Sequence, residues 1–60
     1  MTLEQAIEKA KNGKTVMLPG FTGYFNWSYA ENKLIFSNGN WRSDIDNLDI
    51  KNRTDFYYII

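Results

Sequence analysis

Five aromatic side chains crowd into residues 21–29 of this 60-residue chain, and they restrict its possible folds more than any other feature. They are half of the ten aromatic residues present, namely Phe21, Tyr24, Phe25, Trp27 and Tyr29. A chain of this size buries only about 60% of the surface that its unfolded form exposes. Because so small a core has no room for every ring on one side, we expect some of them to contact another molecule.

The composition narrows the ways in which such a chain can be stabilised. Cysteine and histidine are both missing, which excludes disulfides, thiolate zinc sites and imidazole ligands. Small domains without disulfides or metal sites often rely on a second copy of themselves, so we expect self-association.

Seven basic and seven acidic side chains give zero net charge. A nucleic-acid-binding domain normally has a basic excess, and no apolar run is long enough to span a membrane. We therefore expect a cytoplasmic protein with neither partner.

The first residues predict an amphipathic helix over residues 2–12. Thr2 and Gln5 have the spacing of a capping box, in which each side chain bonds the other residue's backbone amide. Asn12-Gly13 is a typical helix end. Apolar side chains recur at helical spacing on one face, at Leu3, Ala6, Ile7 and Ala10.

After Gly13 the apolar side chains alternate with a period of two, which predicts strands. Four are expected, over residues 14–18, 24–29, 33–37 and 56–60, while residues 42–55 are expected to be polar and irregular with Ile45, Leu48 and Ile50 as anchors. The predicted fold class is α+β, a single domain over residues 1–60. One N-terminal helix packs on a small, mostly antiparallel four-stranded sheet.

The alternation along the second strand separates its rings between the two faces of the sheet. Phe25, Trp27 and Tyr29 are expected to face the helix, and Phe36 and Phe56 to join them in the core. The opposite face then carries Tyr24, Asn26, Met17, Ile35, Tyr57 and Ile59. Such a face is too apolar to remain in water. Either residues 41–55 fold over it or a second copy covers it, and the second is favoured because residues 41–55 are rich in Asp and Asn.

No catalytic arrangement is visible in the sequence. Ser28, Ser37 and Ser43 have no histidine to activate them. The closely spaced carboxylates of Asp44, Asp46 and Asp49 do not form a calcium loop, because Leu48 occupies a ligand position and no glycine follows it. We expect no enzymatic activity, no metal and no cofactor.

A binding site fits the residues better. Aromatic rings stack on flat bases, and arginine or asparagine side chains bond a phosphate or a base edge. Trp41-Arg42, just after the Asn38-Gly39 turn, offers such a pair, although Trp41 would also serve to cap the sheet edge and Phe21 to plug the core. The predicted ligand-binding residues are Phe21, Tyr24, Asn26, Trp41 and Arg42.

Three segments resemble the Thoeris anti-defence 2-like domain family of phages and prophages. The first is the helix and first strand over Leu3–Val16, which contains Ala6-Ile7 and Lys11-Asn-Gly-Lys14. The second runs from Gly20-Phe21 to Tyr24-Phe25-Asn26-Trp27. The third is the ending, Asp55-Phe56 followed by a strand. The chain departs from the family at Leu18, where an Arg is usual, and at Phe21, where a Trp is usual. Its middle is also shorter than in typical members.

The resemblance implies a small α+β protomer that assembles into a homo-oligomer. Members of that family hold cyclic dinucleotides or ADP-ribose-derived signals in pockets between protomers, without cleaving them, inside the bacterial host cell. The implied function is a phage-encoded anti-defence protein that sequesters a nucleotide immune signal, with Arg42 or Arg53 supplying the cation missing at Leu18. The alternatives are a protein-binding inhibitor or adaptor of the anti-CRISPR type and a small structural phage accessory domain.

Overall fold

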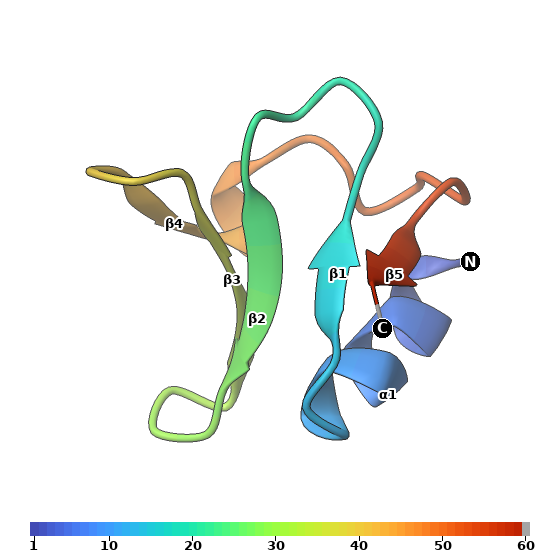
Figure 1. Cartoon of the computed structure of the whole chain (residues 1–60), viewed down its shortest axis with the longest axis horizontal. Helices are drawn as coiled ribbons and strands as arrows, with labels where there is room; N and C mark the ends of the chain where they lie inside the picture. Colours follow the sequence, from blue (N-terminus) through green and yellow to red (C-terminus); the bar gives the residue numbers. More distant parts are fainter. Residues whose placement is uncertain (60) are drawn as a thin grey trace.

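The computed structural model describes residues 1–59, in which one helix packs against one face of a five-stranded sheet (Figure 1). In chain order the elements are α1 (Leu3–Lys11), β1 (Thr15–Met17), β2 (Tyr24–Ser28), β3 (Lys33–Ser37), β4 (Arg42–Asp44), the short 3-10 turn η1 (Ile45–Asn47) and β5 (Tyr57–Ile59). The sheet order is β4-β3-β2-β1-β5, and every neighbouring pair is antiparallel. The α+β class is confirmed. The end of the predicted terminal strand, Ile60, lies outside the described residues.

The prediction of four strands is wrong because β4 was not expected. Its residues pair with β3, so that Arg42 lies opposite Ser37 and Asp44 opposite Ile35. The Asn38–Trp41 turn returns the chain, with the Asn38 backbone N–H donating to the Trp41 carbonyl at 3.0 Å. The three polar residues of β4 form a strand because its pairing with β3 consists of backbone hydrogen bonds. Charged side chains are also common on edge strands.

Helix α1 begins and ends where local side chains complete its backbone hydrogen bonds. The Gln5 backbone N–H donates to the Thr2 hydroxyl at 3.3 Å, and the Thr2 backbone N–H donates to the Gln5 side-chain oxygen at 2.9 Å. The predicted capping box is confirmed. Thr2 and Asn12 are caps outside the helix, so α1 is one residue shorter at each end than predicted.

The loop between β1 and β2 turns sharply at Pro19-Gly20. The Phe21 backbone N–H donates to the Leu18 carbonyl at 3.2 Å, and Gly20 has a φ of +88°, which is the geometry of a type II turn. Gly23 then passes so close to β3 that a Cβ on it would lie 2.7 Å from Cζ of Phe36. The loop therefore directs Phe21 back toward the core, where its ring centroid lies 5.6 Å from that of Phe36.

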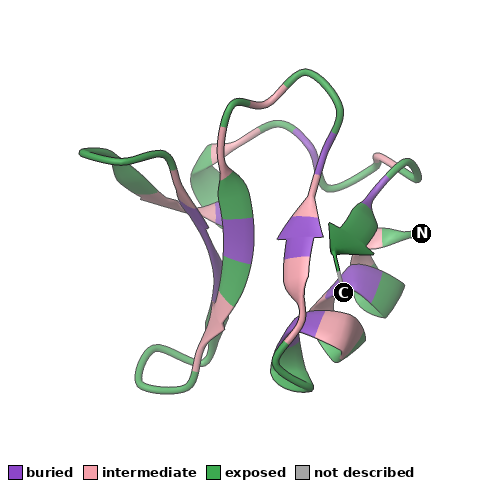
Figure 2. Cartoon of the chain, in the orientation of Figure 1, coloured by how far each residue is buried: buried purple, intermediate pink, exposed green. Residues whose placement is uncertain are grey.

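The core lies between α1 and the facing side of the sheet. Figure 2 shows buried and exposed residues alternating along the first half of β2, as expected for a strand with one covered face. Phe25 is fully buried, and the predicted core positions Phe36 and Phe56 are confirmed at 3% and 2% exposure. Trp27 packs partly buried against this core, and the Lys11 ammonium lies 4.7 Å from its ring centroid.

Tyr29 differs from the prediction that it faces the helix as part of β2. The strand ends at Ser28, and the Tyr29 side chain is 73% exposed. Its hydroxyl does reach α1, where it donates to the Lys11 carbonyl. The ring thus lies against the end of the helix from outside, because the chain is already turning toward β3.

Residues 45–50 close the core beside α1. Ile45 and Ile50 are 7% and 4% exposed and belong to the helix-side core, and Leu48 packs partly buried against it. The expectation that these three residues act as anchors is confirmed. The alternative in which residues 41–55 cover the opposite face of the sheet is wrong, because their apolar side chains are used on the helix side.

Candidate functional site

The face of the sheet turned away from α1 carries two rows of side chains that cross all five strands. The cross-strand pairs define these two rows. Because Val16 lies opposite Phe25, Met17 lies opposite Tyr24 and Thr15 lies opposite Asn26. The first row is Arg42, Ser37, Tyr24, Met17 and Tyr57, and the second is Asp44, Ile35, Asn26, Thr15 and Ile59. We call this surface the open face. The predicted residues of the second face are all on it.

Large side chains on the open face are exposed in the protomer. Tyr24 is 42% exposed, Tyr57 is 47% exposed and Ile59 is 53% exposed. Asn26, on the central strand β2, is exposed as well. These residues come from β2 and β5, which are far apart in sequence, and β1 between them brings them onto one surface. The open face therefore offers two phenol rings and an amide to a ligand or a partner.

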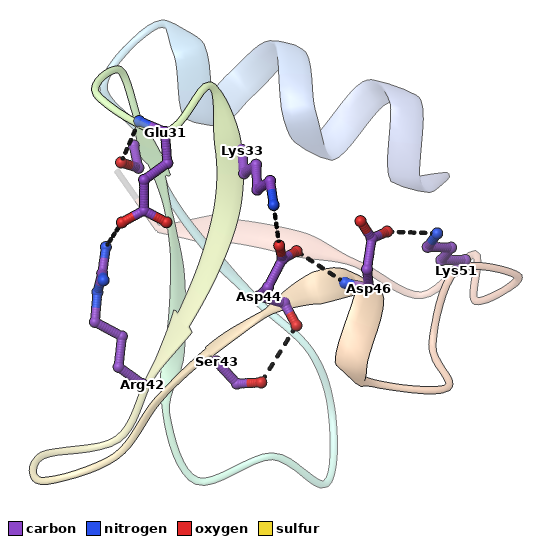
Figure 3. A network of polar contacts seen from close by, with 8 residues as sticks. Glu31, Lys33, Arg42, Ser43, Asp44, Asp46 and Lys51 are labelled. Atoms are coloured by element: carbon purple, nitrogen blue, oxygen red, sulfur yellow. Dashed lines mark hydrogen bonds and ion pairs between the residues drawn. The ribbon is translucent and has the colours of Figure 1, made fainter.

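Ile35 is the exception on this face, at only 5% exposure. Two ion pairs surround its position: Arg42 Nη2 lies 2.8 Å from Glu31 Oε1, and Lys33 Nζ lies 2.6 Å from Asp44 Oδ2. Figure 3 shows Arg42 extended from β4 toward Glu31, which precedes β3. The β3–β4 end of the open face is thus charged and partly covered, whereas its β2–β1–β5 end is aromatic and exposed.

Asp44 is held in its charged form by its neighbours. Its Oδ1 accepts the Asp46 backbone N–H at 3.0 Å while its Oδ2 bonds Lys33 (Figure 3). The Asp46 N–H and then the Lys33 ammonium hold the pKa of Asp44 below its usual value. The hydrogen bond to Asp44 in turn raises the pKa of Lys33. Asp44 therefore acts as a cap for η1 and an ion-pair partner, and both its oxygens are occupied.

Arg53, one of the two cations expected to reach a phosphate, is also engaged. Its Nε donates to Asp55 Oδ1 at 2.8 Å, and its Nη2 donates to the Pro19 carbonyl at 3.3 Å. The hydrogen bonds from Arg53 lower the pKa of Asp55. This arrangement ties the turn between β1 and β2 to the segment before β5, and it lies apart from the two rows of the open face.

Phe21 and Trp41 pack together around Phe36, on the helix side of the sheet. Their ring centroids are each 5.6 Å from that of Phe36, both in edge-to-face geometry. Phe21 is half-buried and packs against the core, and Trp41 is 50% exposed. Of the predicted ligand-binding residues, the open face unites Tyr24, Asn26 and Arg42, whereas Phe21 and Trp41 lie on the other side. One ligand on the open face cannot contact all five.

Sequence reasoning placed Tyr57 and Ile59 on this face but left them out of the ligand-binding set. The alternation within the terminal strand already marked both as neighbours of Met17 and Tyr24. Two shallow hollows lie elsewhere, one beside the start of α1 at Thr2–Glu4 and Lys51–Thr54, the other at Asp46–Asp49 with Lys51 and Asn52. Neither includes a predicted ligand-binding residue.

Within residues 1–59, no group of three or more carboxylates is arranged to hold a metal ion. Over the same residues, α1 is too short and too polar to cross a membrane. Comparisons with models of protein families, with curated proteins and with solved structures found no match.

Proposed function

We propose that this protein works by binding through its open face, and that its ligand is a nucleotide immune signal that it sequesters, uncleaved, as a homo-oligomer. The observation that carries the proposal is the exposure of Tyr24 beside Asn26 on the sheet face turned away from α1. The resemblance to the anti-defence family supplies the class of ligand.

The chemistry of these two residues suits a flat, polar ligand. A half-exposed tyrosine ring is a surface on which a base stacks, worth about 1–3 kcal/mol per base in single-strand-binding proteins. Asn26 lies two residues along the same strand, about 6.6 Å away, and its amide both donates and accepts hydrogen bonds. The two side chains match the face and the edge of a purine.

Arg42 is a cation on the same face, and its ion pair with Glu31 does not prevent a role in binding. Both partners are largely exposed, at 59% and 44% of their side-chain surface. Exposed ion pairs contribute little to stability, so a phosphate can replace Glu31 at small cost. On binding, the Arg42 guanidinium would exchange its bond to the Glu31 carboxylate for two parallel hydrogen bonds to phosphate oxygens.

In the proposed assembly, a second protomer supplies the wall opposite the open face. Small ligands generally need a concave site that buries most of their surface. Neither of the two hollows described above lies on the open face. A ligand held between two copies is shielded from solvent and from a receptor, which is what sequestration requires.

Isothermal titration of the purified protein against cyclic dinucleotides and ADP-ribose cyclisation products tests the proposal. We expect binding to one member of the panel, recovery of the ligand unchanged, and at least a tenfold loss of affinity in Tyr24→Ala and in Asn26→Ala. Trp41→Ala is the matched control and should bind as the wild type does, since Trp41 lies on the helix side. A folded protein that binds none of the panel contradicts the proposal.

A protein partner is the second candidate, favoured by the width of the aromatic surface. Tyr24, Met17 and Tyr57 lie side by side across three strands, and tyrosine is enriched among the residues that contribute most to protein interfaces. An inhibitor or adaptor of this type retains one specific host protein on an affinity column. It loses that partner in Tyr24→Ala while showing no affinity for any nucleotide.

A further inference from the structure

The two edges of the sheet differ sharply in chemistry. At one edge, β4 contains Arg42 and Asp44, and both are engaged in ion pairs with residues at or beside β3. At the other edge, β5 consists of Tyr57, Tyr58 and Ile59, which carry no charge and are all exposed. Proteins normally protect edge strands with charges, proline or bulges, because unpaired backbone groups attract other strands. Only β4 is protected in this way.

Strand β5 has a pairing partner on one side only. It pairs with β1 through Thr15–Ile59, Val16–Tyr58 and Met17–Tyr57. In the sheet formed by residues 1–59 no strand lies beyond it, and Met1 bonds the backbone of Thr54 and Phe56, just before β5 begins. Its start is held in place, because the Phe56 backbone N–H donates to the Met1 carbonyl at 3.2 Å. The edge is therefore both exposed and well positioned to receive another strand.

We propose that β5 pairs antiparallel with β5 of a second copy, around a two-fold axis at Tyr58. This pairing is self-complementary, as a two-fold interface requires. It sets Tyr58 opposite Tyr58 of the partner subunit on the helix side, and Tyr57 opposite Ile59 of the partner subunit on the open face. Aromatic side chains opposite β-branched ones are among the favourable cross-strand pairs. A shift of this register leaves a Tyr57 or an Ile59 without its cross-strand neighbour.

The charges near this edge also favour a second copy as the partner. The chain has zero net charge, so two copies do not repel each other at long range. Two cations lie near β5, and both are engaged within their own protomer: Lys9 lies 5.2 Å from the Tyr58 ring centroid, and the Met1 ammonium donates to the Phe56 carbonyl at 2.7 Å. The three β5 side chains themselves bring no charge to the pairing.

The pairing rests on the homo-oligomer of the proposed function and adds to it an edge-to-edge contact that forms without a ligand. The wall opposite the open face would come from a further copy. One sheet would run through both copies, and their open faces would join into one surface. Tyr57 of each copy would lie at the junction, in the same row as Tyr24. The aromatic surface offered to a ligand or partner would therefore double in width without any change in the protomer.

Sedimentation equilibrium of three proteins tests the edge. The wild type should be dimeric, Tyr58→Lys should be monomeric because two ammonium groups would face each other across the axis, and Tyr24→Lys should remain dimeric. Tyr24→Lys is the matched control for Tyr58→Lys, because it makes the same replacement on the open face, away from the β5 edge. Tyr58→Glu alone should also be monomeric, and mixing it with Tyr58→Lys should restore a dimer. Circular dichroism confirms that each variant is folded.

Hydrogen exchange of the wild type gives a second test that needs no variant. The amides of residues 57–59 should become more protected as protein concentration rises, while those of β4 should not. A wild-type monomer at millimolar concentration overturns the pairing, as does a dimer lost in Tyr24→Lys but kept in Tyr58→Lys. A dimer through β5 that binds no nucleotide rejects the proposed ligand and keeps the pairing. A monomer that binds a nucleotide rejects the pairing and keeps the proposed ligand.

Discussion

Trp41 and Arg42 are adjacent in the chain but lie on opposite sides of the sheet. The Trp41 ring packs edge-to-face on Phe36, with centroids 5.6 Å apart, whereas Arg42 stands opposite Ser37 on the open face and bonds Glu31. Successive residues at the start of a strand point to opposite faces. This pair therefore cannot clamp a single ligand between ring and guanidinium, and its two members have separate roles.

Replacing Trp41 should reduce stability without affecting binding at the open face. Trp41→Ala removes an edge-to-face contact with Phe36, and such pairs contribute about 0.5–1.5 kcal/mol beyond the area they bury. Urea unfolding should show a loss of about 1–2 kcal/mol, since half the ring is already exposed. Tyr24→Ala should change the unfolding free energy by less. Equal effects of the two replacements would contradict the separation of roles.

Gly23 should not tolerate a side chain. A Cβ there would lie 2.7 Å from Cζ of Phe36, and the ring cannot move away because Phe21, Phe25 and Trp41 pack around it. Gly23→Ala should destabilise the fold by about 1–3 kcal/mol, the usual effect of overpacking. Thr22→Ala, at the exposed neighbouring position, is the control and should stay within about 0.5 kcal/mol of the wild type.

Acid should weaken the fold partly through Asp44. Its pKa is lowered in the folded state by the Asp46 backbone N–H and by Lys33, so its contribution is present at neutral pH. That contribution is lost as the pH falls below about 4, through the folded-state pKa. Asp44→Asn should lower the melting temperature at pH 7 and show a smaller further drop down to pH 2. Thermal unfolding across this range measures both.

The matched control for the acid response is Asp49→Asn, at an exposed carboxylate outside the Asp44 network. It should follow the wild-type curve from pH 7 to pH 2. Asp55, whose pKa is lowered by its hydrogen bonds with Arg53, should account for part of the acid loss that remains in Asp44→Asn. A wild type whose stability is unchanged between pH 5 and pH 2 would contradict this assignment.

The capping box of α1 should contribute measurably to so small a domain. Thr2→Ala removes the hydroxyl that accepts the Gln5 backbone N–H, and loss of an N-cap costs about 1 kcal/mol. A melting temperature about 4–8 °C lower is expected for a domain of this size. Thr54→Ala, also exposed, provides the control. An unchanged melting temperature in Thr2→Ala would show that packing alone holds the helix start.

Much of the sheet was predictable because alternation along a strand is a local property. The alternation along residues 24–28 correctly assigned Phe25 to the core and Tyr24 and Asn26 to the opposite face. Strand β4 was not predictable, because its cause is not local. Arg42, Ser43 and Asp44 show no apolar alternation, so nothing in them distinguishes an edge strand from a loop. Only the register with β3 makes them one.

By itself, the sequence determined the elements whose causes lie within a few residues. They include the capped helix, the Pro19-Gly20 turn and the placing of Tyr24 and Phe25 on opposite faces of β2. Tertiary structure decided where residues 45–50 pack, which side Trp41 occupies, and that Tyr24, Tyr57 and Ile59 stay exposed on the open face. These outcomes depend on contacts between distant segments, which compete for one small core. Ile45 and Ile50 filled that core, and Tyr24 remained outside it.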